Sequence, residues 1–251
     1  MNRLPFLLAI LLLANPVTAQ NGEWEFGSSD DHLTRGYAPW RSAYLNALWK
    51  TPSNWTFSGG LRQVERYGLN DDEIHAGTSF PLACCSSLQF EWGHSPSHHV
   101  LPEDYVAFRV ESELAKGWVG AAGWRRSAFD AGMTNVGHLA IERYIGNQRI
   151  GYTLYEGKPD GASFSSSHKL HWAWHYDRSD ERNRLGVSAV SGHETENTGS
   201  SGFLTTSVES LQFSGLHWFN REWAINWEVG RTRQGDIYTR RGFSLGLRHA
   251  F

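Results

Sequence analysis

The sequence predicts an all-β protein whose strands form one closed transmembrane barrel, and three observations support this. Apolar and polar side chains alternate along the chain, which is the period of a β-strand rather than of a helix. Aromatic residues make up 14% of the 251 residues, and many of the 12 tryptophans lie near the ends of the alternating segments, as in barrel girdles. A mean hydropathy of −0.47 excludes a bundle of apolar membrane helices.

Residues 1–19 are predicted to be a secretory signal peptide. Arg3 supplies a positive charge, residues 4–14 are apolar, and small residues precede a cleavage site after Ala19. The apolar run is shorter than the roughly 20 residues that a membrane-spanning helix needs. We therefore expect residues 20–251 to form a single barrel domain.

The alternating pattern divides the mature chain into about 14 strands of the length that a tilted membrane strand requires. Because the first, fourth and twelfth segments show the weakest pattern, twelve strands is the alternative. The expected strands are 22–29, 40–51, 54–66, 72–81, 86–95, 103–115, 117–129, 134–145, 148–157, 165–177, 183–192, 203–219, 222–233 and 237–251. Barrels with both ends in the periplasm have long outer loops and short periplasmic turns. The long stretches near 29–39, 95–103, 157–165 and 192–203 are therefore expected to be outer loops.

The polar face of the strands carries charged residues at mid-strand, which a small apolar core could not bury. A wet lumen would accommodate them, so a soluble sandwich with an inward apolar face is the less favoured alternative. The residues expected to line the lumen are Arg62, Glu91, Arg109, Glu111, Glu113, Arg125, His171, His175, Glu228 and Arg248. Facing rows of both signs would select small polar solutes, whereas charges that pair across the lumen would plug it.

The last strand carries a pattern that resembles the signal read by the outer-membrane barrel assembly machinery. The usual order is polar-x-Gly-x-x-aromatic-x-aromatic, and here Ser244, Gly246, His249 and Phe251 occupy its positions. His249 stands where an aromatic residue is usual. The assembly machinery is therefore an expected partner.

The whole mature chain resembles the YaiO-type family of outer-membrane barrel proteins. The segments that carry this resemblance are GEWEFGSS, GLRQVERYG, ERYIGNQRIGYTLY and GFSLGLRHAF. The resemblance implies a barrel fold in the outer membrane of a Gram-negative envelope. Some members of the family occur beside periplasmic polysaccharide-export modules, so periplasmic export components are possible partners. The resemblance assigns no catalytic residue.

A histidine-rich stretch, GHSPSHHV, falls in the expected outer loop at 95–103. Three interpretations remain open for it: a metal site, a serine–histidine hydrolase, and a plain polar loop. The residues concerned are His94, Ser95, Ser97, His98 and His99. A hydrolase would need an acidic residue to orient the histidine, and the local sequence supplies none.

Three further features carry weaker predictions. His171 and His175 lie about 13 Å apart on a strand, which is too far for one metal ion. Cys84 and Cys85 lie in a predicted periplasmic turn, where they could form a vicinal disulfide or pair with a partner chain. The acidic strings at 29–31 and 70–73 could bridge to lipopolysaccharide through divalent cations, or could be solvated loop charges.

Together these features predict a channel or export-associated pore for small polar solutes or saccharides. We expect outer-membrane lipids and lipopolysaccharide as surroundings, and no catalytic residue, metal or cofactor. A net charge of −3 offers no basic surface for nucleic acid. The alternatives are a plugged barrel that acts as a surface-displayed structural or interaction protein and, third, an envelope lipid hydrolase.

Overall fold

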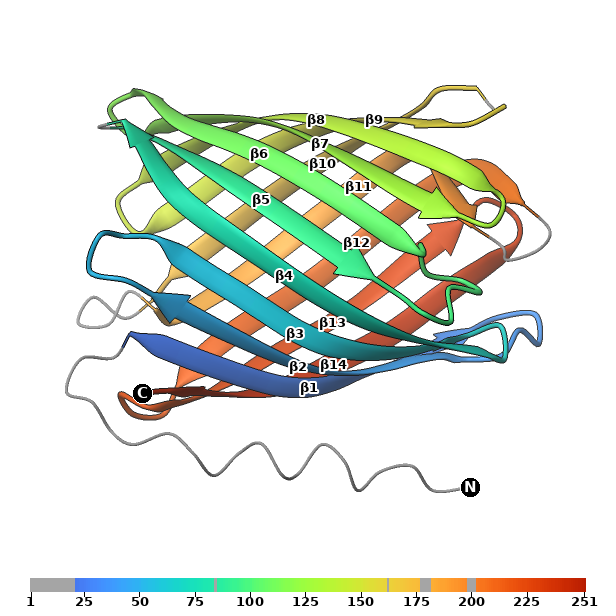
Figure 1. Ribbon diagram of the computed structural model, residues 1–251, viewed down its shortest axis with the longest axis horizontal. Helices are drawn as coiled ribbons and strands as arrows, with labels where there is room; N and C mark the ends of the chain where they lie inside the picture. Colours follow the sequence, from blue (N-terminus) through green and yellow to red (C-terminus); the bar gives the residue numbers. More distant parts are fainter. Residues whose placement is uncertain (1–20, 84, 162, 177–181, 198–201) are drawn as a thin grey trace.

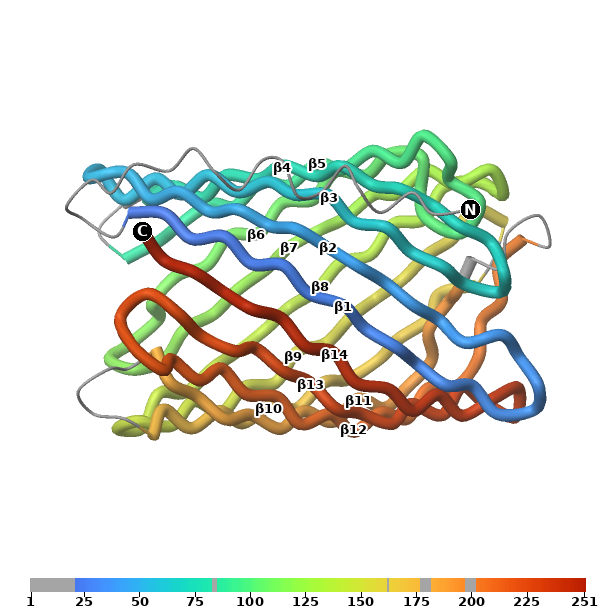
Figure 2. Tube along the Cα trace, turned by 90° about the horizontal axis from the view of Figure 1, so that it is seen from below, coloured from blue at the N-terminus to red at the C-terminus, as the bar shows by residue number. Residues whose placement is uncertain are grey.

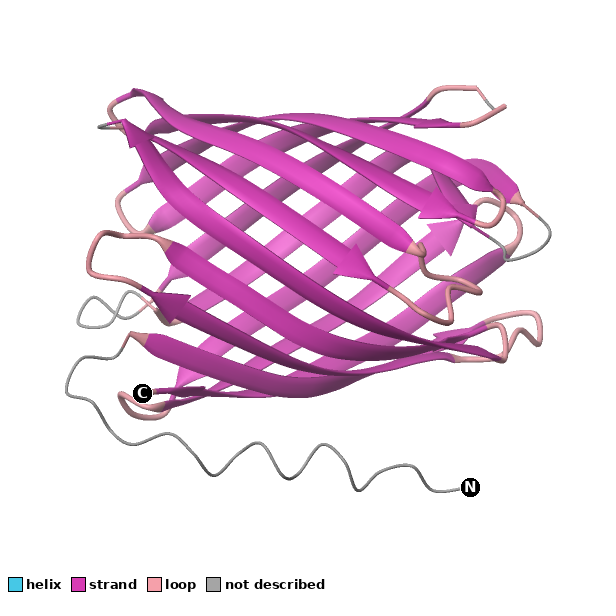
Figure 3. Ribbon diagram, viewed as in Figure 1, coloured by secondary structure: helices cyan, strands magenta, loops and turns pink. Residues whose placement is uncertain are grey.

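The computed structural model describes residues 21–251 except 84, 162, 177–181 and 198–201. The described chain forms a closed barrel of antiparallel strands (Figure 1), drawn in one colour in Figure 3. The strands are β1 (Gly22–Leu33), β2 (Trp40–Lys50), β3 (Thr56–Arg66), β4 (Leu69–Ala83), β5 (Ser86–His94), β6 (Asp104–Ala115), β7 (Trp118–Phe129), β8 (Gly132–Ile145), β9 (Gln148–Pro159), β10 (Ser165–His175), β11 (Arg184–Asn197), β12 (Phe203–Trp218), β13 (Trp223–Gln234) and β14 (Tyr238–Ala250). The all-β fold and the 14 predicted strands are confirmed. No helix of the described chain is long and apolar enough to cross a membrane.

Each strand pairs with its neighbours in sequence, and β1 pairs with β14 to close the sheet (Figure 2). In the closing ladder Glu25 lies opposite Arg248 and Phe26 lies opposite Leu247. Closure satisfies every strand edge, which is required where lipid offers no hydrogen-bond partner.

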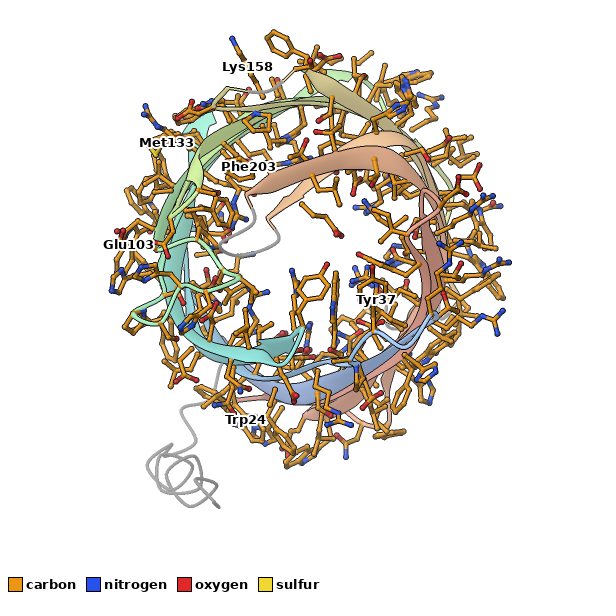
Figure 4. The ribbon with its side chains drawn as sticks, turned by 90° about the vertical axis from the view of Figure 1, so that its right-hand side faces the viewer. Trp24, Tyr37, Glu103, Met133, Lys158 and Phe203 are labelled. Carbon is orange, nitrogen blue, oxygen red and sulfur yellow. The ribbon has the colours of Figure 1, made fainter. Side chains whose placement is uncertain are left out.

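The strand period places one set of side chains outside the barrel, where Trp24 projects in Figure 4. Large apolar side chains at mid-strand on this face are exposed, among them Leu61, Phe108, Leu211 and Phe243. Such a band is stable against lipid but not against water. It identifies the outer face as the lipid-contacting face.

The predicted assembly-signal strand is part of an aromatic cluster at the end of the barrel that holds both termini of the described chain. The His249 ring centroid lies 4.4 Å from that of Trp223, 5.4 Å from Trp24 and 6.2 Å from Phe251. His249 therefore takes the packing place of an aromatic residue in the girdle. Whether the assembly machinery reads this strand stays a prediction.

The two acidic strings, expected in or beside outer loops, lie wholly within strands. β1 continues to Leu33, so the acidic string at 29–31 lies within it, and the string at 70–73 lies within β4. Polar cross-strand partners account for this, because Arg41 Nε donates to Asp30 Oδ2 at 3.0 Å. Of the expected outer loop at 192–203, residues 192–197 belong to β11 and residue 203 begins β12. A polar composition was a poor guide here because strand ends above the membrane have no need of apolar residues.

The expected difference between outer and periplasmic connections holds only in part. Two outer connections, 67–68 and 130–131, are tight turns, whereas the chain between β10 and β11 at the periplasmic end spans 176–183. In the first of these turns Tyr67 and Gly68 have φ angles of 56° and 77°. Two successive positive φ angles make a turn whose twist matches that of the paired strands, so no longer loop is needed.

Candidate functional site: the lumen and its outer mouth

The inner face of the barrel carries all ten residues expected to line the lumen. In the pairing register these residues share the face of Glu25, opposite to the face that carries Trp24. They are Arg62, Glu91, Arg109, Glu111, Glu113, Arg125, His171, His175, Glu228 and Arg248. The inner face is therefore strongly charged and of mixed sign.

Charged side chains in the lumen pair along the wall rather than across the pore. Arg109 binds Glu111 on its own strand at 3.0 Å. Arg248 binds Glu25 on the adjacent strand at 2.7 Å. No ion pair of the described chain joins strands on opposite sides of the barrel. Lateral pairing satisfies these charges and leaves the middle of the lumen uncrossed by salt bridges.

A hollow in the lumen wall, lined by Glu91, Arg125 and Tyr155 among others, combines charge with aromatic surface. The Arg125 guanidinium lies 3.7 Å from the centroid of the Tyr105 ring, and the Tyr105 hydroxyl donates to Glu91 Oε1 at 2.6 Å. Arg109 Nη1 lies 3.0 Å from His138 Nε2 on the same wall. The Tyr105 ring is buried, so the groups that face the hollow are the charged and imidazole side chains together with the ring of Tyr155. Donors, acceptors and a ring face together suit hydroxyl-rich solutes.

The outer mouth is narrowed by the ends of β11 and β12, a unit that we call the mouth hairpin (residues 193–197 and 203–206). Glu196 accepts hydrogen bonds from the Tyr238 hydroxyl at 2.8 Å and from the Tyr67 hydroxyl at 3.3 Å. Tyr67 follows β3, which lies six strands from β11 around the barrel. A bond between such distant strands requires the hairpin to fold inward across the opening.

A second contact shows the same inward fold. Phe203 at the start of β12 packs edge-on against Phe129 at the end of β7, with ring centroids 5.8 Å apart. In Figure 4, which looks along the barrel, the chain at Phe203 lies inside the ring of strands. Ser167 donates to Glu194 at 3.4 Å from β10. The mouth hairpin is therefore held from three sides.

The wall that Glu196 approaches is basic and aromatic. The guanidinium carbons of Arg66 and Arg240 lie 4.6 and 4.8 Å from the ring centroid of buried Trp40. Asp31 lies 3.9 Å from Arg240. The mouth thus has two arginines on its wall and two carboxylates, Glu194 and Glu196, on the hairpin.

Tyr67 is a stable hydrogen-bond donor at this position. Burial, followed by the charge of Glu196, raises the pKa of Tyr67 to about 12. Its hydroxyl therefore keeps its proton throughout the physiological range and holds the hairpin carboxylate.

None of these mouth residues was expected from the sequence. The hairpin reads as a polar loop, and Tyr67 and Tyr238 flank turns, so only the folded structure brings them together. The repeated Glu-x-Glu at 194–196 was the one local sign of strand period.

The histidine-rich loop is in the predicted outer connection between β5 and β6, and each of its histidines has its own aspartate. The Nδ1–Oδ1 distance is 2.8 Å for His99 and Asp71, and His99 lies on the loop surface. The other two pairs are His94 with Asp104 at 3.1 Å and His98 with Asp130 at 3.2 Å. No group of three or more potential metal ligands occurs among the described residues. The sequence could not show these pairs, because Asp71 reaches His99 only through strand pairing.

The two serines of the loop anchor it to β4. Ser95 Oγ donates to the carbonyl of Asp72 at 2.7 Å, and Ser97 Oγ accepts from the amide of Asp72 at 3.0 Å. Asp71 accepts the amide protons of Val100 and Leu101 at 2.7 and 2.8 Å. These bonds give both hydroxyls a structural role.

Two further features are the histidines of β10 and the cysteine pair after β4. His171 lies 3.6 Å from Glu142, and His175 lies four residues further along β10, so the two histidines do not share a partner position. Cys84 lies outside the described residues, so a Cys84–Cys85 disulfide stays a prediction.

Comparison with known families places the barrel. The family described as the YaiO membrane beta barrel domain matches residues 21–197, which is more than half of the chain. The chain belongs to this family. The YaiO-family barrel is accordingly an outer-membrane β-barrel, as the sequence predicted. No curated protein matches its sequence.

Three solved structures with TM-scores above 0.5 are similar in fold to the YaiO-family barrel. A bacterial polysaccharide outer membrane secretin has a TM-score of 0.57 at 9% identity, covering 92% of this chain and 99% of the other. OmpT of Vibrio cholerae has a TM-score of 0.52 at 11% identity, covering 94% and 100%. The Pseudomonas putida toluene transporter TodX has a TM-score of 0.51 at 10% identity, covering 92% and 89%. At these identities the likeness shows the fold alone.

Proposed function

We propose that this YaiO-family barrel is a passive channel for small polar solutes or saccharides, without catalysis or a cofactor. The observation that carries this proposal is the mouth hairpin, which sets Glu194 and Glu196 beside the arginines of the opposite wall. A solute that enters would pass between charges of opposite sign and the partly exposed ring of Tyr67. Such a narrow, polar and aromatic passage suits hydroxyl-rich molecules.

The lumen below the mouth supports the same proposal. Its charges pair along the wall, and the hollow at Arg125 and Tyr155 offers ring and hydrogen-bonding surface. A saccharide could exchange hydrogen bonds from one wall position to the next without meeting a deep binding site. The similarity to a polysaccharide secretin is one of fold and is consistent with this solute class.

The test is single-channel conductance of residues 20–251, refolded into a planar bilayer. Stable conductance steps that scale with salt are expected. Arg240→Gln should shift ion selectivity towards cations, because it removes positive charge at the mouth, and Glu194→Gln should shift it towards anions. Arg126→Gln, on the outer face of β7, is the matched control and should change nothing. Equal selectivity in all four proteins would refute the proposed passage.

A plugged barrel displayed at the surface is the second candidate, and one observation favours it. The mouth hairpin contacts β7, β10, β14 and the turn after β3, so it crosses part of the opening. A correctly folded barrel that stays silent in the bilayer, with its outer loops accessible on cells, would establish this alternative.

A further inference from the structure

The outer face of the barrel carries two arginines whose placement nothing in the lumen explains. Arg231 on β13 and Arg241 on β14 are exposed and lie directly opposite each other in the strand ladder. Like charges in directly opposed positions destabilise a sheet unless another group compensates them. Neither side chain makes a hydrogen bond or an ion pair with another described residue.

Two carboxylates lie near this pair, but neither forms an ion pair with it among the described residues: Asp30, opposite Phe243, is bound to Arg41 at 3.0 Å, and the other is Glu209 at the edge of the same groove. Arg233 adds a third positive charge, but it is bound to Asp236 at 3.0 Å and to the carbonyl of Gly235. On the adjacent strand His32 lies opposite Arg241, so the row continues with another basic group. Glu209 lies opposite Arg233, and both are one outward-facing position further from the membrane than Arg231. Glu209 forms no salt bridge to Arg231 or Arg241 in the described chain.

The position of the pair relative to the lipid-facing band points to the ligand. Val229 and Phe243, which lie opposite each other one outward position below the arginines, are 47% and 59% exposed. Leu211 and Phe213 continue this apolar surface on β12, and a groove joins them to the arginines. A molecule that fills the groove must present acyl chains to the apolar part and an anion to the basic part.

We propose that this groove binds a phosphorylated glycolipid of the outer leaflet, with its phosphate held between Arg231 and Arg241. A guanidinium binds phosphate through two parallel hydrogen bonds, and a phosphate between two opposed arginines would remove their repulsion. The acyl chains would lie along Leu211, Val229 and Phe243. Lipopolysaccharide has this combination of phosphates and acyl chains, and the pair is on the side of the barrel that faces its leaflet.

The test measures binding of bisphosphorylated lipid A to the refolded barrel in detergent by native mass spectrometry. Arg231→Ser/Arg241→Ser should bind about tenfold more weakly than wild type, which corresponds to about 1.4 kcal/mol. Arg231→Lys/Arg241→Lys keeps the charge but loses the paired geometry, so its affinity should fall between the two. Arg35→Asn/Arg126→Ser is the matched control, because it removes two outer-side arginines that do not lie on neighbouring strands.

Two further arms identify the source of the phosphate and the state of the protein. Dephosphorylated lipid A should bind wild type no better than it binds the double serine variant, and inorganic phosphate should not displace the lipid. The double serine variant should unfold at the same or a higher temperature than wild type in lipid-free detergent, because a repulsion has been removed. The proposal is overturned if wild type and the double serine variant bind lipid A equally well, or if wild type binds lipid A equally well with and without its phosphates. It is also overturned if inorganic phosphate displaces the lipid, or if the arginines stabilise a dimer of the barrel in the absence of lipid.

Discussion

Removal of the Glu196 carboxylate is the sharpest test of the mouth hairpin. In the structure this group accepts one bond at 2.8 Å from Tyr238 and a longer one at 3.3 Å from Tyr67. A hydrogen bond to a charged group contributes about 1.5–3 kcal/mol. Because the hairpin is at the water-exposed end of the barrel, we take the low end for the short bond and less for the long one, about 2–3 kcal/mol together.

This magnitude predicts a large change in the docking equilibrium of the hairpin. Since each 1.4 kcal/mol is a factor of ten, Glu196→Ala should raise the ratio of undocked to docked hairpin by about 30- to 150-fold. Single-channel recordings should then show a higher open-state conductance or more frequent open substates than wild type. Limited proteolysis of the folded barrel should cut the hairpin faster, and this second measurement does not depend on conduction.

A matched control distinguishes the loss of the Glu196 hydrogen bonds from a simple loss of negative charge. Glu209→Ala removes a carboxylate from the same strand pair, but from its outer face, and should behave as wild type in both assays. If Glu196→Ala leaves channel substates and the rate of cleavage unchanged, the contacts of Glu196 do not hold the hairpin, and the proposed narrowing loses its basis.

Three further predictions concern the lumen, the outer loop and the wall. Arg109→Ala should shift ion selectivity towards cations in planar bilayers, because it leaves a carboxylate two positions along the strand without its partner; unchanged selectivity would contradict a wet lumen at this level. The hydrogen bond to Asp71 raises the pKa of His99, so the support that this pair gives the loop is present below about pH 6.5 and is lost as the pH rises through the raised value; an NMR titration should show the elevated midpoint, and Asp71→Asn should abolish the elevation. Gly27→Ala should destabilise the barrel by about 1–3 kcal/mol, because the new methyl group would lie 2.5 Å from the ring of a facing tyrosine, whereas Gly137→Ala, with its nearest atom at 4.0 Å, should be nearly neutral in a heat-dependent gel shift.

The alternation of apolar and polar residues predicts most of the fold, because one side of every strand faces lipid. That constraint is local, so apolar residues such as Val229 and Phe243 predict a strand from the sequence around them, without knowledge of which strands pair with it. It fades where the strands leave the membrane, which is why the ends of β1 and β11 were expected to be loops. Polar residues there satisfy strand pairing equally well.

The functional site was less predictable, since it depends on contacts between distant parts of the chain. The lumen-facing residues follow from the two-residue period of the strands alone, and Arg109 and Glu111 are predicted on that basis. Glu196 meets Tyr67 across 129 positions of sequence, and Asp71 meets His99 across 28. Such pairs depend on strand register and on the inward fold of the hairpin, neither of which a single sequence displays.

The pairing of β1 with β14 imposes an order on folding, because it can form only after the last strand of the chain is in place. Glu25 is almost fully buried in the finished wall, yet the arginine that neutralises it lies 223 positions later. Until β14 arrives, β1 has a bare edge and a carboxylate with no cation on that side. The contact between Glu25 and Arg248, which closes the barrel, therefore forms only in a chain that has all of its strands. A chain halted before the last strand would keep an unpaired edge and an unmatched charge, and both would mark it as unfinished.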